Sequence, residues 1–193
     1  MIKAVLFDLA GVVVSEGFEI WQQKNISDRA SIADALLTIG PQIDRGTMPV
    51  DAYVKLFATI THMSPEEVNK GILAEYEIHS DILALLNSLH AKGIKTGIIT
   101  NFPEEWFDYL VNKFHLTTYF DAFVVSSKIH IVKPEAGLYQ ASLAQLDIHP
   151  EEAIFVDDRE ENVLGAKDSG MHGLLFTTST QLQKDLEKIG LSV

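Results

Sequence analysis

The sequence predicts an α/β fold: a doubly wound parallel sheet with a small helical segment inserted after the first strand. Two observations predict the sheet. Short, continuously apolar runs recur along the chain, and helical patterns separate the later runs. Runs that are apolar on both faces are typical of buried parallel strands. A third observation predicts the insertion. Residues 16–79 carry helical spacing throughout, with no strand-like run between the helices.

The expected strands are the five apolar runs, at residues 2–7, 96–99, 122–125, 153–156 and 173–176. Helices with one apolar face are expected between the later strands, at residues 80–92, 103–114, 135–146 and 161–169. Because strands alternate with helices, the connections should be right-handed crossovers within one sheet.

The insertion should consist of helices at residues 18–24, 27–39, 50–61 and 64–76. The last one has a strong start signal, since Ser64 can cap it, Pro65 suits its first turn and Glu67 completes a capping box. We therefore expect two domains: a core formed by residues 1–15 and 80–193, and a helical domain formed by residues 16–79.

The composition restricts the classes of partner. A chain of 193 residues with 47% hydrophobic residues and no cysteine should fold without disulfides or thiolate-bound metals, as in a reducing cytoplasm. A net charge of −12 argues against nucleic acid and anionic membranes as partners. No signal peptide is visible, and no apolar stretch is long enough for a transmembrane helix. We expect a cytoplasmic protein.

Polar residues directly follow three of the expected strands, and another lies in the loop after a fourth. Open α/β sheets bind ligands at this edge. The polar residues are Asp8, Thr100, Asn101, Lys133, Asp157 and Asp158. Each alone has a structural explanation as a turn, cap or surface residue. Together, three ionised carboxylates require a cation, and oxygen ligands favour Mg²⁺. A lysine and a hydroxyl group beside them indicate a phosphoryl-binding site.

The order of these residues adds information. Asp, then Thr, then Lys-Pro, then Asp-Asp resembles the four motifs of the haloacid dehalogenase superfamily, here at residues 5–13 (VLFDLAGVV), 97–101 (GIITN), 132–136 (VKPEA) and 154–158 (IFVDD). Response-regulator receivers use similar residues in a different order. The motifs are most similar to those of helical-cap members, such as the glucose-1-phosphate phosphatase-like and the epoxide hydrolase N-terminal phosphatase-like groups.

This resemblance implies a Mg²⁺-dependent phosphatase that acts on a small phosphorylated metabolite such as a sugar phosphate, with residues 16–79 as its cap. Asp8 resembles the nucleophile that forms an aspartyl-phosphate, and Lys133 would neutralise the developing charge. The phosphoryl oxygens would be bound by Thr100, Asn101 and Lys133. Mg²⁺ would be bound by Asp8, Asp158 and the carbonyl of Ala10, with Asp157 either a further ligand or a residue that supports the ligands.

One position departs from the phosphatase pattern. Two residues after the nucleophile, phosphatases of this superfamily normally carry a second aspartate, which protonates the leaving group and activates water. Here that residue is Ala10, which cannot transfer a proton. Loss of a positioned general acid–base typically costs ~10²–10⁴ in rate.

Three interpretations of Ala10 stay open. The protein is a phosphatase that obtains its proton from water, the leaving group or a cap residue, for which Glu16 is a candidate. It is a hydrolase resembling phosphonoacetaldehyde hydrolase, which needs a Schiff-base lysine in the cap, the candidates being Lys24, Lys55 and Lys70. Or it binds phosphate and Mg²⁺ without turnover.

Several further side chains are assigned from their position. We expect the aromatic residues Phe18, Trp21, Tyr53 and Phe57 to pack inside the insertion, with one of them facing the substrate. Trp106 and Phe107 should anchor their helix against the sheet. Arg45 lies in a turn and could face an anionic substrate, and His130 could reach the rim of the site.

Overall fold

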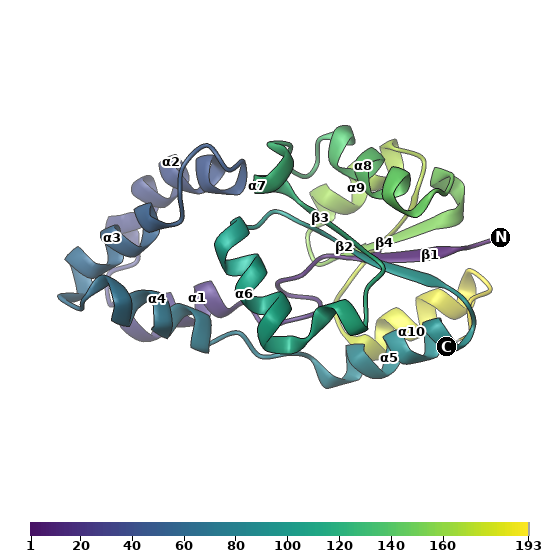
Figure 1. The fold of residues 1–193 in the computed structure, drawn as a ribbon, viewed down its shortest axis with the longest axis horizontal. Coiled ribbons are helices and arrows are strands. Elements are labelled where there is room, and N and C mark those ends of the chain that lie inside the picture. The colour runs from purple at the N-terminus through teal and green to yellow at the C-terminus, as the bar shows by residue number, and fades with distance from the viewer. Residues whose placement is uncertain (193) are drawn as a thin grey trace.

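A parallel five-stranded sheet forms the centre of the computed structural model, which describes residues 1–192 (Figure 1). Its strands are β1 (Ala4–Phe7), β2 (Lys95–Thr100), β3 (Ala122–Val125), β4 (Ala153–Asp157) and β5 (His172–Leu175), in the order β3-β2-β1-β4-β5. All neighbouring strands are parallel. The expected doubly wound α/β fold is confirmed, and β1 lies in the middle of the sheet between β2 and β4.

Helices cover both faces of the sheet. On one face lie α5 (Ser80–Ala91), α6 (Glu104–Phe114) and α10 (Ser179–Lys188), and on the other α8 (Ala136–Leu146) and α9 (Glu160–Asp168). Alternate residues of the strands point to opposite faces of the sheet and enter two separate hydrophobic cores. In β1, for example, Val5 and Phe7 belong to one core, and Ala4 and Leu6 belong to the other. The strands are therefore buried on both faces, as their continuous apolar runs indicated.

Three short helical turns and one short helix lie between the longer elements of the described chain. They are the 3₁₀ turns Ala30–Ile32, Leu116–Thr118 and Pro150–Glu152, and α7 (Ser126–Ile129). Helix α10 was not among the predicted elements. It is mostly polar and buries Leu182 and Leu186 against the sheet and α5, so its apolar face is narrow.

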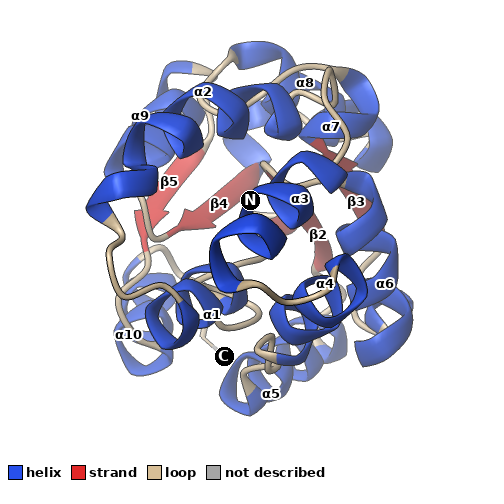
Figure 2. Cartoon of the chain, turned by 90° about the vertical axis from the view of Figure 1, so that its left-hand side faces the viewer, coloured by secondary structure: helices blue, strands red, loops and turns tan. Residues whose placement is uncertain are grey.

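Four helices follow β1 and lie together at the opposite end of the molecule from the N-terminus (Figure 1, Figure 2). They are α1 (Gly17–Asn25), α2 (Ala33–Asp44), α3 (Asp51–Thr61) and α4 (Pro65–Ala74). The capping box of α4 is confirmed: Glu67 N donates to Ser64 Oγ (3.2 Å) and Ser64 N donates to Glu67 Oε2 (2.8 Å).

The expected helix at 27–39 was placed too early. Residues 30–32 form a 3₁₀ turn, and α2 continues through Pro41 to Asp44. A proline inside a helix usually ends it, because its ring removes a hydrogen bond. In α2 the helix continues past Pro41, and Gly40 and Ile43 on either side of it are buried.

Two chain segments connect α1–α4 to the sheet, and they pair with each other. Val14 and Ile78 form an antiparallel bridge, and Ser15 N donates to Glu77 O (2.9 Å). The paired segments fix the start of α1 beside the carboxyl end of β1. Within residues 1–192, the structure contains no helix long and apolar enough to span a bilayer.

A second contact joins the C-terminal end of α2 to α7 and the loop that follows α7. We call it the α2–α7 contact, and it consists of Asp44, Arg45 and Gly46 on one side and Ser126, Ser127, His130 and Glu135 on the other. Arg45 forms an ion pair with Glu135 and donates to His130 O (3.1 Å). His130 Nδ1 lies 2.8 Å from Arg45 O. Arg45 ends α2 in a turn, as predicted, but it binds Glu135 and does not line the cavity at Asp8, and His130 likewise serves this contact instead of the site rim.

Candidate active site

The carboxyl ends of three adjacent strands bring the chemically active side chains together. Asp8 follows β1, Thr100 ends β2 and Asp157 ends β4. Because β1 lies between β2 and β4, these side chains meet at one edge of the sheet. A cavity of about 250 Å³ opens there, lined by Asp8, Ala10, Glu16, Phe18, Asp44, Tyr53, Tyr76, Thr100, Asn101, Phe102, Pro103, Trp106, Lys133, Asp158, Arg159 and Asn162.

Lys133 is the ammonium group at the centre of the site. Its Nζ lies 2.8 Å from Asp8 Oδ2 and 2.6 Å from Asp157 Oδ2, and its side chain is 1% exposed. Burial alone would lower the pKa of Lys133, but the two carboxylates outweigh it and raise that pKa. The lysine is therefore charged and joins the ends of β1 and β4.

Asp8 is held from two sides. Its Oδ1 accepts a hydrogen bond from Leu9 N (2.7 Å), and its Oδ2 faces Lys133. Burial raises the pKa of Asp8 to about 6, Lys133 acts to lower it, and Asp157 acts to raise it. A buried carboxylate with a fixed orientation and an adjacent ammonium group is suited to nucleophilic attack on a phosphoryl group.

Asp157 has its oxygens occupied by protein donors. Oδ1 accepts from Arg159 N (2.8 Å) and Asn162 Nδ2 (3.0 Å), and Oδ2 accepts from Lys133 Nζ (2.6 Å) and Asn162 Nδ2 (3.0 Å). The side chain is completely buried. These bonds fix the loop that carries Asp158, which lines the cavity beside it.

The three aspartates create a site for a cation. Asp8, Asp157 and Asp158 each offer an oxygen atom, and these atoms lie within 4.8 Å of one another. Burial, together with Asp157, raises the pKa of Asp158, which means that its charged form lacks compensation. Lys133 balances one of three negative charges, and a donor set made of oxygen alone fits a hard divalent ion such as Mg²⁺.

Thr100 and Asn101 differ in what they contact. Thr100 is 1% exposed and lines the cavity at the end of β2. The Asn101 amide instead binds the backbone of Lys133: Lys133 N donates to Asn101 Oδ1 (2.8 Å), and Asn101 Nδ2 donates to Lys133 O (3.2 Å). Asn101 thus positions the lysine-bearing loop.

The α1–α4 side of the cavity is aromatic and acidic. Phe18 and Tyr53 line it, with ring centroids 4.6 Å apart, while Trp21 and Phe57 pack together inside the α1–α4 helices. Glu16 and Asp44 supply carboxylates, and burial raises the pKa of Asp44 to about 6. Asp44 and the core residue Arg159 were not predicted, because their place in the cavity depends on how α2 lies across the sheet edge.

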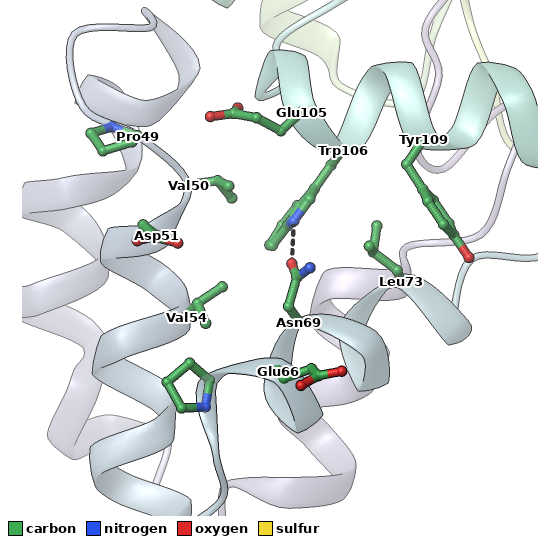
Figure 3. Close-up of a pocket in the computed structure, with 11 residues that line it drawn as sticks. Pro49, Val50, Asp51, Val54, Glu66, Asn69, Leu73, Glu105, Trp106 and Tyr109 are labelled. Atoms are coloured by element: carbon green, nitrogen blue, oxygen red, sulfur yellow. Dashed lines mark hydrogen bonds between the residues drawn. The ribbon is translucent and has the colours of Figure 1, made fainter.

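Trp106 separates this cavity from a second one. Its indole Nε1 donates to Asn69 Oδ1 (2.8 Å), a bond from α6 to α4 (Figure 3). The second cavity has a volume of about 480 Å³ and includes Asp51, Glu66 and Glu105 in its lining. Among the described residues that line it there is no lysine or arginine, so it offers no cationic side chain to a phosphate. Trp106 is buried in the core shared with the sheet, as its predicted anchoring role requires, and it also forms a wall of both cavities.

The three lysines considered for a Schiff base lie elsewhere. Lys24 pairs with Glu75 (2.6 Å), and Lys55 pairs with Asp51 (3.2 Å). The lining of the cavity at Asp8, among residues 1–192, includes Lys133 and none of Lys24, Lys55 or Lys70. The structure gives no support to a hydrolase that forms a Schiff base on this segment.

Known proteins are similar to the whole chain. A sesquiterpene phosphatase of Aspergillus oryzae is 29% identical over 97% of this chain and 96% of its own length. Two solved structures share the fold at 18% identity. One is a haloacid dehalogenase-like hydrolase from Porphyromonas gingivalis (TM-score 0.76, all of both chains). The other is an enzyme of that family from Bacteroides thetaiotaomicron in complex with magnesium and inorganic phosphate (TM-score 0.73, 92% of this chain and 95% of that one).

The sequence profile of the haloacid dehalogenase-like hydrolases matches residues 29–176, which are most of the chain. The matched region contains Thr100, Lys133 and Asp157, and Asp8 lies before it, joined to it in space through Lys133. The expected resemblance is thereby confirmed: the chain belongs to the haloacid dehalogenase-like hydrolase family.

Proposed function

We propose that this hydrolase is a Mg²⁺-dependent phosphatase of small phosphate monoesters, with Asp8 as its nucleophile. The observation that carries the proposal is the buried pair of Asp8 and Lys133, 2.8 Å apart at the floor of a cavity with two further aspartates. Similarity to a phosphatase over nearly the whole chain supports the same reaction type.

Mg²⁺ would be held by Asp8, Asp158 and the main-chain carbonyl of Ala10, with Asp157 orienting Lys133 and the Asp158 loop. We assign this indirect role to Asp157 because its oxygens already accept four hydrogen bonds from protein groups. When bound, the ion would neutralise the carboxylates and the phosphoryl oxygens, so that the substrate is not repelled.

Each remaining residue of the floor has a proposed task. Asp8 attacks the phosphorus atom, and Lys133 stabilises the charge on the transferred group. Thr100 donates its hydroxyl to a phosphoryl oxygen. Asn101 acts through Lys133, because its side-chain amide binds both the backbone N–H and the backbone carbonyl of that residue.

Residues 16–79 would form a cap domain over a core of residues 1–15 and 80–193. Support comes from Glu16, Phe18, Asp44 and Tyr53, which line the cavity opposite Asp8. A cavity of about 250 Å³ suits a phosphate group with a short organic part, and sugar phosphates are one such class. Closure of the cap would exclude water and select the substrate. The lack of cysteine and the net charge of −12 support a cytoplasmic enzyme without nucleic-acid or membrane partners.

The test is phosphate release from a panel of phosphomonoesters with and without Mg²⁺. We expect turnover that requires the metal and that Asp8→Asn abolishes, while circular dichroism shows the fold unchanged. No release from any ester with Mg²⁺ present, by a folded wild-type protein, would refute the proposal. Release that persists in Asp8→Asn would refute the assignment of the nucleophile.

A further inference from the structure

We propose that Glu16 exchanges protons with the leaving group and with the attacking water, in place of the carboxyl group that position 10 lacks. The inference rests on the proposed phosphatase function and adds a catalytic residue to it. Three features of the structure carry it: the place of the carboxyl group, its freedom from other partners, and the fixed backbone on both sides of it.

The Glu16 carboxylate lies beside the segment that carries Ala10. Glu16, Asp8 and Ala10 line the same cavity. A Cβ atom on Gly11 would come within 3.0 Å of Glu16 Oε1 and 2.6 Å of Asp158 Oδ2. Glu16 Oε1 therefore lies against the residue next to Ala10, on the side of the chain that faces Asp158.

The carboxyl group of Glu16 is not used by its own helix. Glu16 is the N-cap residue of α1, a position where side chains normally accept a hydrogen bond from the first turn. Its side chain accepts none of these bonds, and only its carbonyl enters the helix, by accepting from Ile20 N (2.9 Å). Glu16 is an exposed residue and lines the cavity, so a substrate oxygen and a water molecule can both reach its carboxyl group.

The backbone around Glu16 is held on both sides. Ser15 Oγ donates to Glu75 O (2.9 Å) and accepts from Glu77 N (2.9 Å). Gly17 lies so close to the Tyr76 ring that a Cβ atom there would come within 2.6 Å of it. A proton-transfer group needs such fixed placement, because small displacements weaken catalysis steeply.

The protonation behaviour of Glu16 is consistent with this role. Partial burial in the cavity wall raises the pKa of Glu16 to about 7, with further increases from Asp158, Asp8 and Glu19 and an opposing effect from Arg159. An acid that must give and then regain a proton works best with a pKa near the working pH, and burial, the largest cause, moves the pKa of Glu16 in this direction.

Hydrolysis of the ester proceeds in two half-reactions. In the first, a bond forms between Asp8 Oδ and phosphorus, the bond from phosphorus to the leaving oxygen breaks, and that oxygen takes the proton of Glu16. In the second, water attacks the aspartyl-phosphate and gives a proton to the Glu16 carboxylate. The bond from Asp8 to phosphorus then breaks, and inorganic phosphate leaves with Asp8 and protonated Glu16 restored.

The test compares two esters of nearly equal size, phenyl phosphate and 4-nitrophenyl phosphate, in the presence of Mg²⁺. Nitrophenolate leaves without protonation, whereas phenolate benefits from an acid. In Glu16→Gln, kcat/KM for phenyl phosphate should therefore fall by ~10²–10⁴, and kcat/KM for 4-nitrophenyl phosphate by much less. Because the second half-reaction also lacks its base, the variant should release a burst of one nitrophenolate per active site and then slow down.

Glu19→Gln is the matched control, because Glu19 lies on α1 one turn further on, pairs with Arg29 and does not line the cavity. It should keep both kcat/KM values within about twofold. Equal losses on both esters in Glu16→Gln, or no loss on phenyl phosphate, would overturn the role of Glu16. If the wild-type protein hydrolyses neither ester nor any other phosphomonoester, the phosphatase function itself fails, and the inference fails with it.

Discussion

At the residue scale, the site divides into a part that the chain order made predictable and a part that it did not. Asp8, Thr100 and Asp157 could be identified because each ends or follows a buried strand, and Lys133 because Pro134 and the motif order mark its loop. The same reasoning could not distinguish residues that would contact the metal ion or the phosphate from residues that position other side chains. That Asp157 and Asn101 use their polar atoms on protein groups follows only from the hydrogen bonds of the folded chain.

Gly11 is the residue where this arrangement is tightest, and Gly11→Ala should inactivate the enzyme. Its φ of +82° is strained for alanine, and the new Cβ would collide with Asp158 Oδ2 at 2.6 Å. We expect a fall in kcat/KM of at least ~10², the lower end of the losses found when a positioned catalytic group is disturbed. Steady-state kinetics on 4-nitrophenyl phosphate measures the loss.

Gly93→Ala is the control for backbone strain. Gly93 also has a positive φ, +73°, but a Cβ atom there would meet nothing within 4 Å. Both variants should lose about 1 kcal/mol of stability from the strained backbone, and only Gly11→Ala should lose activity. Equal activity in the two variants would contradict the proposed crowding of Asp158 and Glu16 over Gly11.

At the scale of elements, the sheet was easier to predict than the α1–α4 helices. The strands of the structure begin and end within about two residues of the predicted runs, because burial on both faces leaves a continuous apolar signal. In contrast, α2 was placed too early, because residues 30–32 form a 3₁₀ turn and the helix continues through Pro41 to Asp44. Helix α10 was missed because its apolar face is narrow. The side of α1–α4 that faces the site depends on tertiary contacts such as that between Arg45 and Glu135.

The α2–α7 contact should control how the proposed cap closes. Gly46 lies so close to α7 that a Cβ atom would come within 2.2 Å of Ser127 O, a backbone atom that cannot move aside easily. Gly46→Ala should therefore push α2 away from the core, raising KM severalfold and exposing the α1–α4 segment to limited proteolysis. Protease sensitivity and KM are measured together.

Gly190→Ala provides the comparison for this variant. Gly190 has a φ of +88° and nothing within 4 Å of a Cβ atom. It should keep the wild-type KM and protease resistance despite the same kind of backbone strain. If Gly46→Ala behaves like Gly190→Ala, the α2–α7 contact does not hold the cap in place.

For the molecule as a whole, the net charge and the carboxylates of the site both favour a cation in the site. The chain carries a net charge of −12, and the site at the ends of β1 and β4 places three aspartates around one lysine. Such a protein would repel a phosphate unless a cation is present. Membership of the haloacid dehalogenase-like hydrolases and a floor built at the ends of β1, β2 and β4 account for the phosphoryl chemistry. Ala10 leaves the proton transfer to another residue, for which the structure offers Glu16.

The proposed mechanism requires that Asp8 carries the phosphoryl group during turnover. The most direct measurement mixes the enzyme and Mg²⁺ with ³²P-labelled 4-nitrophenyl phosphate, quenches in acid within the first turnover, and locates the label by peptide mapping. We predict a hydroxylamine-sensitive label on the peptide that contains Asp8, and a larger amount of it in Glu16→Gln, where the second half-reaction is slow. Turnover without a labelled peptide, or a label that survives in Asp8→Asn, would contradict the account.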